Sequence, residues 1–312
     1  MRQLLQYIIT TVIIAMFALL GINYFLSKNL SNQKEDVFGK LNTLFVSNEP
    51  YDIIFIGSSR IYHSVDPFLM DSITGTKCFN FGLDGNTIIE ASMILNAYLE
   101  NHPSPKIVVL NIDLFTLQTE KESTFRDFTV FLPYKSNSSV HSTLSEFLLY
   151  EKKLSFISFL TPAFYDDFKK FMAFKHVVNP AGNPDKILVR GCNFYDDTWE
   201  GNDLPVELEY TITTKGMDIL KSFADVCKQN NIQLVLTYAP QTREYTVATK
   251  RFDTFLQTID SLSRKNDALF FEYSCMDICD NRKFFKSHAH LNRAGAYAYT
   301  QKLAQAIVEH QK

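Results

Sequence analysis

The chain has 312 residues, of which 46% are apolar, and a formal net charge of −3 from 31 basic and 34 acidic residues. This length and apolar content allow a full hydrophobic core, organised as one large domain or two small ones. Because acidic and basic residues nearly balance, the composition provides no basic face for nucleic acid. We therefore expect no nucleic-acid partner.

The N-terminal segment from Leu4 to Leu26 is largely apolar and carries no charge. About 20 helical residues cross a hydrocarbon core, so this run predicts a transmembrane helix. A cleaved signal peptide is the alternative, but the run exceeds the usual apolar region and no clear small-x-small cleavage site follows before Lys28. We predict an anchor over residues 1–28 and a stalk or short helix over 29–50, which makes the chain a single-pass protein of the cell membrane.

The orientation of this anchor rests on two opposing signals. Arg2 precedes the segment, whereas Lys28, Lys34 and Lys40 follow it, and a count of basic residues favours a cytoplasmic C-terminal side. A long domain can translocate largely regardless of charge, and the short tail resembles that of a signal anchor. We favour an extracytoplasmic domain.

Beyond residue 50, strand patterns alternate with helix patterns. The apolar run Ile53 to Ile56, ended by Gly57, is typical of a strand covered on both faces. Further strands are predicted over Cys78–Phe81, Ile107–Ile112, Ile232–Tyr238 and Leu269–Tyr273, and helices over Thr87–Leu99, Thr214–Gln229, Phe252–Ser263 and Ala294–Val308. This alternation predicts βαβ units in an α/β domain over residues 51–312, with a parallel sheet and helices on both of its faces.

The interval from about residue 116 to 210 interrupts this alternation and is rich in Phe, Tyr and Leu. We interpret it as an inserted helical cap. Aromatic residues at helical spacing usually form core, so we expect most of them to pack the insertion onto the sheet, and the alternative is that some line a substrate cleft.

Cysteine gives little information about function. Only Cys275 and Cys279 of the five cysteines are close in sequence, with no second pair and no histidine at zinc-finger spacing. We interpret the cysteines as ordinary buried thiols and expect neither a metal nor a cofactor.

Two short stretches carry the chemistry. Asp52 to Arg60 is an apolar strand that ends in a Gly-Ser-Ser turn, and His288 to Gly295 places a histidine just ahead of a helix. A hydroxyl at the carboxyl end of a parallel strand lies in the crevice where open α/β sheets bind ligands. A histidine within reach of that hydroxyl could act as its general base, as in a serine hydrolase.

These blocks resemble, in the same order, those of the SGNH, or GDSL-like, hydrolases. The resemblance covers Asp52 to about Phe115 and Ile232 to Val308, and the Gly-Ser-Ser-Arg block is similar to that of membrane-anchored bacterial members. It implies a flavodoxin-like αβα sandwich with Ser59 as nucleophile and His290 as base. It also implies that the backbone N–H groups of Ser59 and Gly85 bind the oxyanion.

The chain departs from the family pattern at two blocks. Ser287 occupies the position of the aspartate that would hold the imidazole, and His288 is less suited as the base by motif register. The third block is expected as Gly-x-Asn, but the sequence after the middle strand offers Asn111 or Asp113 without that glycine spacing. Asn111 is our candidate for the third oxyanion donor.

The resemblance therefore implies a membrane-anchored serine esterase or acyltransferase that acts on an O-acyl ester of an envelope glycan or a lipid. An acyl group would pass from Ser59 to water or to a sugar hydroxyl. Two alternatives stay open: a catalytically impaired envelope protein that keeps the fold for binding, and a lipid-handling thioesterase or transferase that works beside the bilayer.

Overall fold

The computed structural model describes residues 1–119, 125–201 and 207–310. Its contacts divide the chain into two compact units. We call Met1–Val46 with Asp127–Ile187 the N-terminal unit, and Ser47–Arg126 with Leu188–Lys312 the sheet unit. Residues 127–187 of the predicted insertion thus pack with the predicted anchor and stalk, whereas residues 188–201 belong to the sheet unit. Residues 120–124 and 202–206 of that insertion lie outside the described residues.

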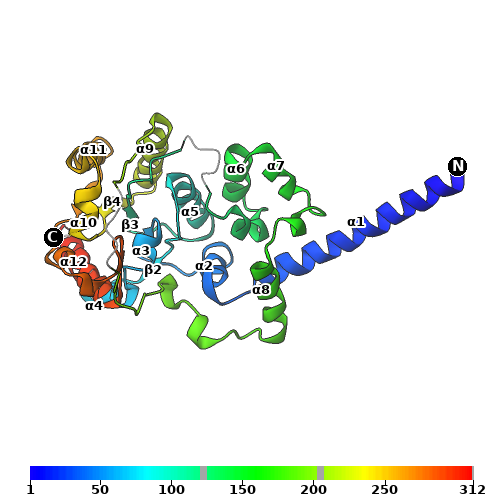
Figure 1. Ribbon diagram of the computed structural model, residues 1–312, viewed down its shortest axis with the longest axis horizontal. Helices are drawn as coiled ribbons and strands as arrows, with labels where there is room; N and C mark the ends of the chain where they lie inside the picture. Colours follow the sequence, from blue (N-terminus) through cyan, green and yellow to red (C-terminus); the bar gives the residue numbers. More distant parts are fainter. Residues whose placement is uncertain (120–124, 202–206, 311–312) are drawn as a thin grey trace. The chain divides into compact units, whose positions relative to one another are not determined.

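The sheet unit is built on a five-stranded parallel sheet with the order β2-β1-β3-β4-β5, of which Figure 1 labels β2, β3 and β4. The strands are β1 (Ile53–Ile56), β2 (Cys78–Asn80), β3 (Ile107–Asn111), β4 (Gln233–Tyr238) and β5 (Leu269–Glu272). This is the flavodoxin-like strand order, in which the carboxyl ends of the strands form the ligand crevice. The predicted fold class is confirmed, and each predicted strand is present within two residues of its predicted bounds.

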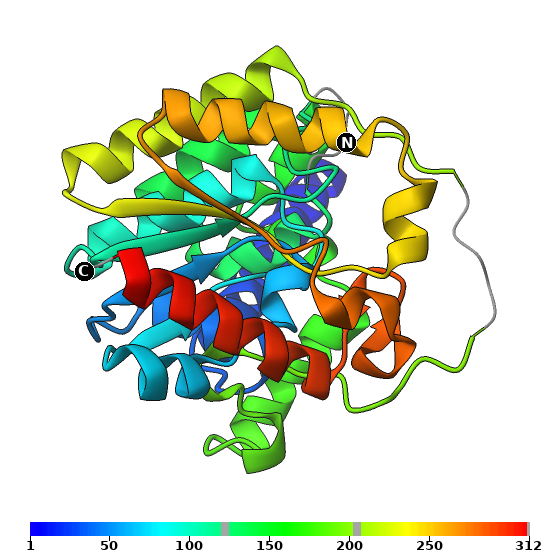
Figure 2. The same cartoon turned by 90° about the vertical axis from the view of Figure 1, so that its left-hand side faces the viewer.

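Helices cover both faces of this sheet, as Figure 2 shows. One face packs against α4 (Pro67–Thr74) and α12 (Arg293–His310), and the other carries α5 (Ile88–Asn101), α9 (Thr214–Gln229) and α11 (Phe252–Lys265). Successive strand residues point to opposite faces, and both sets are buried: Phe55 lies in the cluster with Tyr299 of α12, while its neighbour Ile54 is also fully buried. Continuous apolar strands follow from this double coverage.

Several elements of the sheet unit lie outside the predicted ones. They are α3 (Ser59–Tyr62), α10 (Arg243–Ala248) and a hairpin of β6 (Phe285–Ser287) and β7 (His290–Leu291), and short 3-10 turns η5 (Val189–Gly191), η6 (Asp277–Asp280) and η7 (Arg282–Phe284) accompany them. The helix α4 was also not predicted, although Asp66 caps it by accepting from the Phe68 N–H at 2.9 Å and Pro67 opens its first turn.

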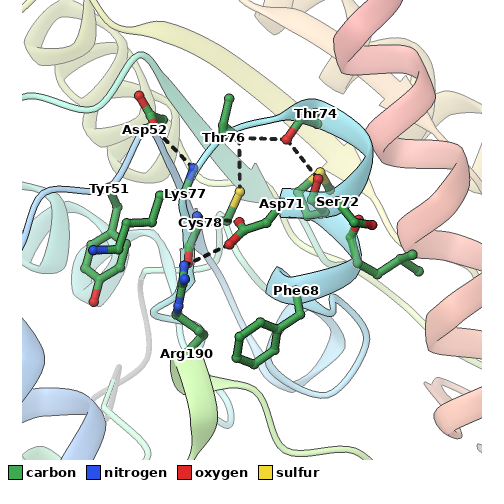
Figure 3. Close-up of polar contacts among 12 residues, drawn as sticks. Tyr51, Asp52, Phe68, Asp71, Ser72, Thr74, Thr76, Lys77, Cys78 and Arg190 are labelled. Carbon is green, nitrogen blue, oxygen red and sulfur yellow. Dashed lines mark hydrogen bonds and ion pairs between the residues drawn. The ribbon is translucent and has the colours of Figure 1, made fainter.

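The outward-facing backbone of edge strand β2 is covered by side chains from distant segments (Figure 3). Asp71 Oδ1 accepts from the Cys78 N–H at 2.7 Å, and Arg190 Nη1 donates to the Cys78 carbonyl at 2.9 Å. Arg190 also pairs with Asp71 Oδ2 at 3.0 Å. These contacts satisfy the outward-facing backbone groups of Cys78, so this position of the edge strand is not available for pairing with another chain.

The N-terminal unit is helical. It contains α1 (Arg2–Leu30), α2 (Asp36–Phe45), η1 (Phe128–Tyr134), α6 (Ser138–Phe147), α7 (Tyr150–Lys153), η2 (Leu154–Phe156), η3 (Thr161–Ala163), α8 (Asp167–Val178) and η4 (Pro184–Lys186). Helix α1 is long and apolar enough to cross a membrane, and the described residues contain one helix of this kind. It continues two residues beyond the predicted end of the anchor, and most of the predicted stalk folds as α2 or as the turn before it.

Candidate active site

The turn after β1 places two serines at the carboxyl edge of the sheet. Gly57 has φ of +148°, and a Cβ there would lie only 2.9 Å from the Asn111 Cβ, so the position requires glycine. Ser58 then caps α3 by accepting from the Arg60 N–H at 3.2 Å. As a result, Ser59 is the first residue of α3 and stands just beyond the end of the strand.

The hydroxyl of Ser59 meets the imidazole of His290. Ser59 Oγ lies 2.9 Å from His290 Nε2, although the two residues are 231 positions apart in the sequence. His290 opens β7, where it pairs across the hairpin with Ser287 of β6. Ser287 Oγ lies 2.9 Å from His290 Nδ1. When Nε2 accepts the Ser59 proton, Nδ1 carries hydrogen and donates it to the Ser287 oxygen.

The surroundings of His290 favour its neutral form. Burial is the largest cause of the lowered pKa of His290, which falls to about 4 under the further effects of the neighbouring Arg60 and His63 and against those of Asp113 and Asp84. The imidazole is therefore unprotonated at neutral pH and free to accept a proton. Ser287 supplies orientation through its hydroxyl but no negative charge to stabilise the cation that would form.

A buried ion pair lies under the same turn. Arg60 Nη1 contacts Asp113 Oδ1 at 2.7 Å, Ser58 Oγ donates to Asp113 Oδ2, and Arg60 Nη2 donates to the Ala239 carbonyl. Burial lowers the pKa of Arg60, but Tyr238, whose ring lies 4.5 Å from the guanidinium carbon, and Asp113 outweigh burial and raise it above its ordinary value. The guanidinium stays charged, and it fixes the orientation of α3.

The loop after β2 brings Gly85 toward the serine turn. The Leu83 N–H donates to the Gly57 carbonyl at 2.9 Å, and Asn86 Nδ2 donates to the same oxygen at 3.2 Å. Gly85 itself has φ of +69°, and a Cβ there would meet the Arg126 side chain at 2.8 Å. Glycine is therefore required between two residues that hold the turn. The role of Gly85 as an oxyanion donor stays a prediction.

Asn111 ends β3 and is fully buried beside Gly57. Its Oδ1 accepts from the Ala239 N–H at 3.2 Å, while its Nδ2 has no hydrogen-bond partner among the described residues. Buried polar atoms are nearly always paired, so this amide donor is an exception among the described residues, and the role of Asn111 as an oxyanion donor stays a prediction. Asp113, the other candidate at this block, is already engaged by Ser58 and Arg60.

Sequence reasoning missed the side chains around the histidines. His63 Nε2 contacts Asp84 Oδ1 at 3.0 Å, and its ring stacks on Tyr195 at 4.2 Å between centroids. Tyr195 in turn lies edge-on to His290 at 5.9 Å. Tyr195 belongs to the predicted insertion, where no motif or spacing marks it as part of a site.

His288 has a different environment from His290. Its Nδ1 lies 3.3 Å from Thr242 Oγ1, and the ring of Trp199 packs edge-on against it at 4.0 Å. The guanidinium carbon of Arg282 lies 4.2 Å from the centroid of the Trp199 ring, and Arg282 Nη2 pairs with Glu244 Oε1 at 3.0 Å. The imidazole that reaches Ser59 is thus the one of His290.

The arrangement can perform nucleophilic chemistry. It offers a hydroxyl at the carboxyl edge of the sheet, a neutral imidazole in contact with it, and nearby hydrogen-bond donors at the Gly85 loop and at Asn111. What it lacks, relative to a Ser-His-Asp triad, is a carboxylate on the far nitrogen of the imidazole.

No protein-family model matches the chain, and no curated protein matches it in sequence. Among solved structures, the chain is similar to the esterase EstA from Pseudoalteromonas sp., with 12% identity and a TM-score of 0.43 over 83% of this chain and 98% of that one. It is similar to a GDSL-like lipase from Bacteroides thetaiotaomicron, with 13% identity and a TM-score of 0.41 over 83% and 88%. It is also similar to a catalytic mutant of an acetylxylan esterase from Geobacillus stearothermophilus, with 12% identity and a TM-score of 0.39 over 84% of this chain and 93% of that one.

Proposed function

We propose that the chain is a serine esterase or acyltransferase of the SGNH type, anchored in a membrane by α1 and acting on an O-acyl ester. The observation that carries the proposal is the 2.9 Å contact between Ser59 Oγ and the neutral His290 Nε2 at the carboxyl edge of the sheet. Hydrogen-bond reach of about 2.6–3.2 Å is what a nucleophile and its base require.

In the proposed reaction, Ser59 Oγ attacks the ester carbonyl while its proton passes to His290 Nε2. The tetrahedral oxyanion is held by the backbone N–H groups of Ser59 and Gly85 and by the unpaired Asn111 Nδ2. His290 then gives the proton to the leaving alcohol, and an acyl group remains on Ser59. Water or a sugar hydroxyl attacks this acyl-enzyme in the second half-reaction, with His290 again taking the proton.

Aromatic side chains near the histidines support a glycan as the substrate. Tyr195 lies edge-on to His290, and Trp199, the single tryptophan of the sequence, packs on His288. Both are only partly buried. Aromatic rings combine a large apolar face with a polar edge, and they suit a ligand that has both kinds of surface. With the anchor, this favours an O-acylated envelope glycan, on the extracytoplasmic side.

Labelling with a fluorophosphonate tests the nucleophile. We expect the full chain to react covalently, and Ser59→Ala to lose the label. Ser58→Ala is the matched control, because it removes the neighbouring hydroxyl, which contacts Asp113 rather than His290. Labelling that persists in Ser59→Ala would remove Ser59 as the nucleophile.

The alternative is a catalytically impaired binding protein with the same fold. Two observations favour it: Ser287 occupies the place of the triad carboxylate, and the pKa of His290 is lowered to about 4, which makes it a weak base. An unlabelled wild-type chain that still binds O-acylated glycan would support this alternative.

A further inference from the structure

Helix α8 carries an apolar face whose side chains are largely exposed. Phe168, Phe171 and Phe174 are 51%, 60% and 60% exposed, and Val178 at the end of the helix is 87% exposed. Contiguous exposed aromatic side chains are unusual on a surface that meets only water. We call these four side chains the phenylalanine face.

The opposite side of α8 is fixed to the rest of the N-terminal unit. The Met172 carbonyl accepts from Gln33 Nε2 at 3.0 Å, and Met172 and Ala173 are buried. Lys169 is also buried, and its ammonium pairs with Asp127 and Asp166 at 2.7 Å each. The phenylalanine face therefore points outward because the helix is held by its other side.

Helix α8 packs against the C-terminal part of the predicted membrane span (Figure 1). The rings of Phe174 and Phe25 lie 5.0 Å apart. Between the two helices is a pocket of about 480 Å³ with an almost wholly apolar lining, formed by Ala18, Gly21, Ile22, Phe25 and Leu26 of α1, Pro162 of η3, and Lys170 and Phe174 of α8. Five of these eight residues belong to the apolar run of α1.

Two tyrosines mark the depth of α1 in a bilayer. Tyr7 and Tyr24 are both well exposed, and Lys28 lies 5.5 Å from the ring centroid of Tyr24. The two tyrosines are 17 positions apart, roughly 26 Å of helix at about 1.5 Å per residue, close to the hydrocarbon thickness of about 30 Å. Tyrosines gather at the two membrane interfaces, so Tyr24 marks the interface on the side of the folded chain.

The pocket residues from Ala18 to Leu26 bracket Tyr24 in the sequence of α1. The part of α8 that contacts them therefore lies at the depth of that interface. An amphipathic helix at this depth buries its apolar side among the lipid chains close to the headgroups.

We propose that α8 lies in the membrane interface beside α1, with the phenylalanine face among lipid acyl chains and an acyl chain in the pocket shared by the two helices. The proposal rests on the part of the proposed function that makes α1 a membrane span, and it is independent of the esterase chemistry. The chain then has two membrane contacts rather than one.

Tryptophan fluorescence in vesicles tests the proposal. The full chain with Trp199→Phe, so that no native tryptophan remains, receives one new tryptophan by Ile14→Trp in α1, Phe171→Trp in α8 or Val247→Trp in α10. Val247 is the matched control, because it is an exposed apolar position, 79% accessible, outside the N-terminal unit. Each variant is reconstituted in phosphatidylcholine vesicles with or without bromine on the acyl chains.

We expect the bromolipid to remove at least about half of the emission of Ile14→Trp and Phe171→Trp, and to leave Val247→Trp nearly unchanged. Quenching of Ile14→Trp without Phe171→Trp would overturn the proposal, keep the anchor, and leave the phenylalanine face to a protein partner. No quenching of Ile14→Trp would refute the membrane span itself. Equal quenching of all three variants would show general adsorption and would also overturn the proposal.

Discussion

Ser58 and Ser59 are consecutive residues of one turn with opposite environments. The Ser58 hydroxyl is fully buried, donates to Asp113 and caps α3. The Ser59 hydroxyl is partly accessible and contacts His290. Asp113 contacts both Ser58 and Arg60, so this carboxylate supports the backbone of the turn. The group that contacts Nδ1 of the His290 imidazole is instead the hydroxyl of Ser287. Ser58 therefore holds the turn, whereas Ser59 presents the hydroxyl that the proposed function makes the nucleophile.

Removing the reactive hydroxyl is expected to have the largest effect. Ser59→Ala should lower turnover of p-nitrophenyl acetate by about 10⁴-fold or more, since loss of a nucleophile leaves only binding and oxyanion stabilisation. Ser58→Ala should retain most turnover and lose about 1 kcal/mol of stability through its helix cap. Equal activity losses in the two variants would contradict the separation between them.

Breaking the ion pair beneath the turn tests the supporting side. Asp113→Asn leaves the buried Arg60 charge without its partner and should lower the free energy of unfolding by about 3–5 kcal/mol. Urea unfolding of the detergent-solubilised full chain measures it. The control is Lys228→Met, which removes an ion pair with Asp267 that is exposed on both sides and should change stability far less than Asp113→Asn does. Similar changes in the free energy of unfolding in both variants would show that the buried ion pair contributes no more to stability than the exposed one.

Asn111 combines both kinds of environment, since its oxygen accepts from the Ala239 N–H while its side-chain nitrogen has no hydrogen-bond partner in the described part of the chain. Asn111→Ala should lower kcat by about 10²–10³-fold with a smaller change in KM, the usual cost of one oxyanion donor. The thermal midpoint, measured on the same sample, distinguishes this loss from unfolding. An unchanged kcat in a folded variant would exclude Asn111 from the oxyanion site.

Supplying the missing charge should have the smallest effect and the opposite sign. Ser287→Asp places a carboxylate at His290 Nδ1 and should raise the pKa of His290 from about 4, because a nearby opposite charge favours the cation. The reaction needs neutral His290, so kcat/KM of the wild type should fall only as the pH drops through about 4. In Ser287→Asp this acidic limb should move to higher pH, and turnover at neutral pH should rise. Ser287→Ala is the control that removes the hydroxyl without adding charge. A lower turnover in Ser287→Asp, with Ser59 still reactive, would show that the register of this block is wrong.

Regular, long elements were predictable from the sequence, and short ones were not. The helix Thr214–Gln229 has the predicted bounds, and the apolar run Ile53–Ile56 is the predicted strand. Such segments carry many periodic positions, each of which repeats the same signal. The hairpin that holds Ser287 and His290 has strands of only three and two residues, too short for any period to appear.

The site was predictable in its blocks but not in its surroundings. The sequence indicated a serine at a strand end and a histidine before a helix, and the structure adds the distance that joins them. Tyr195 and His63 meet because of the tertiary fold, which no local spacing records. The ion pair between Asp113 and Arg60 likewise depends on the path of the chain after β1 and β3. The sequence alone left open whether Asn111 or Asp113 belongs to the candidate site.

The continuity of α1 into folded structure has a consequence for encounter rates. A disordered stalk over residues 29–50 would let a catalytic domain sample a sphere of roughly 25 Å around its anchor. Instead, α1 runs to Leu30, the Asn42 side chain donates to the carbonyls of Leu30 and Gln33, and α2 follows within the same unit. On the proposed function, a span that continues into a folded unit would place encounters with substrate under two-dimensional diffusion in the membrane, at a rate set by the surface density of acyl groups. The bulk concentration of a soluble ester would then be a poor measure of the substrate concentration that the proposed esterase meets.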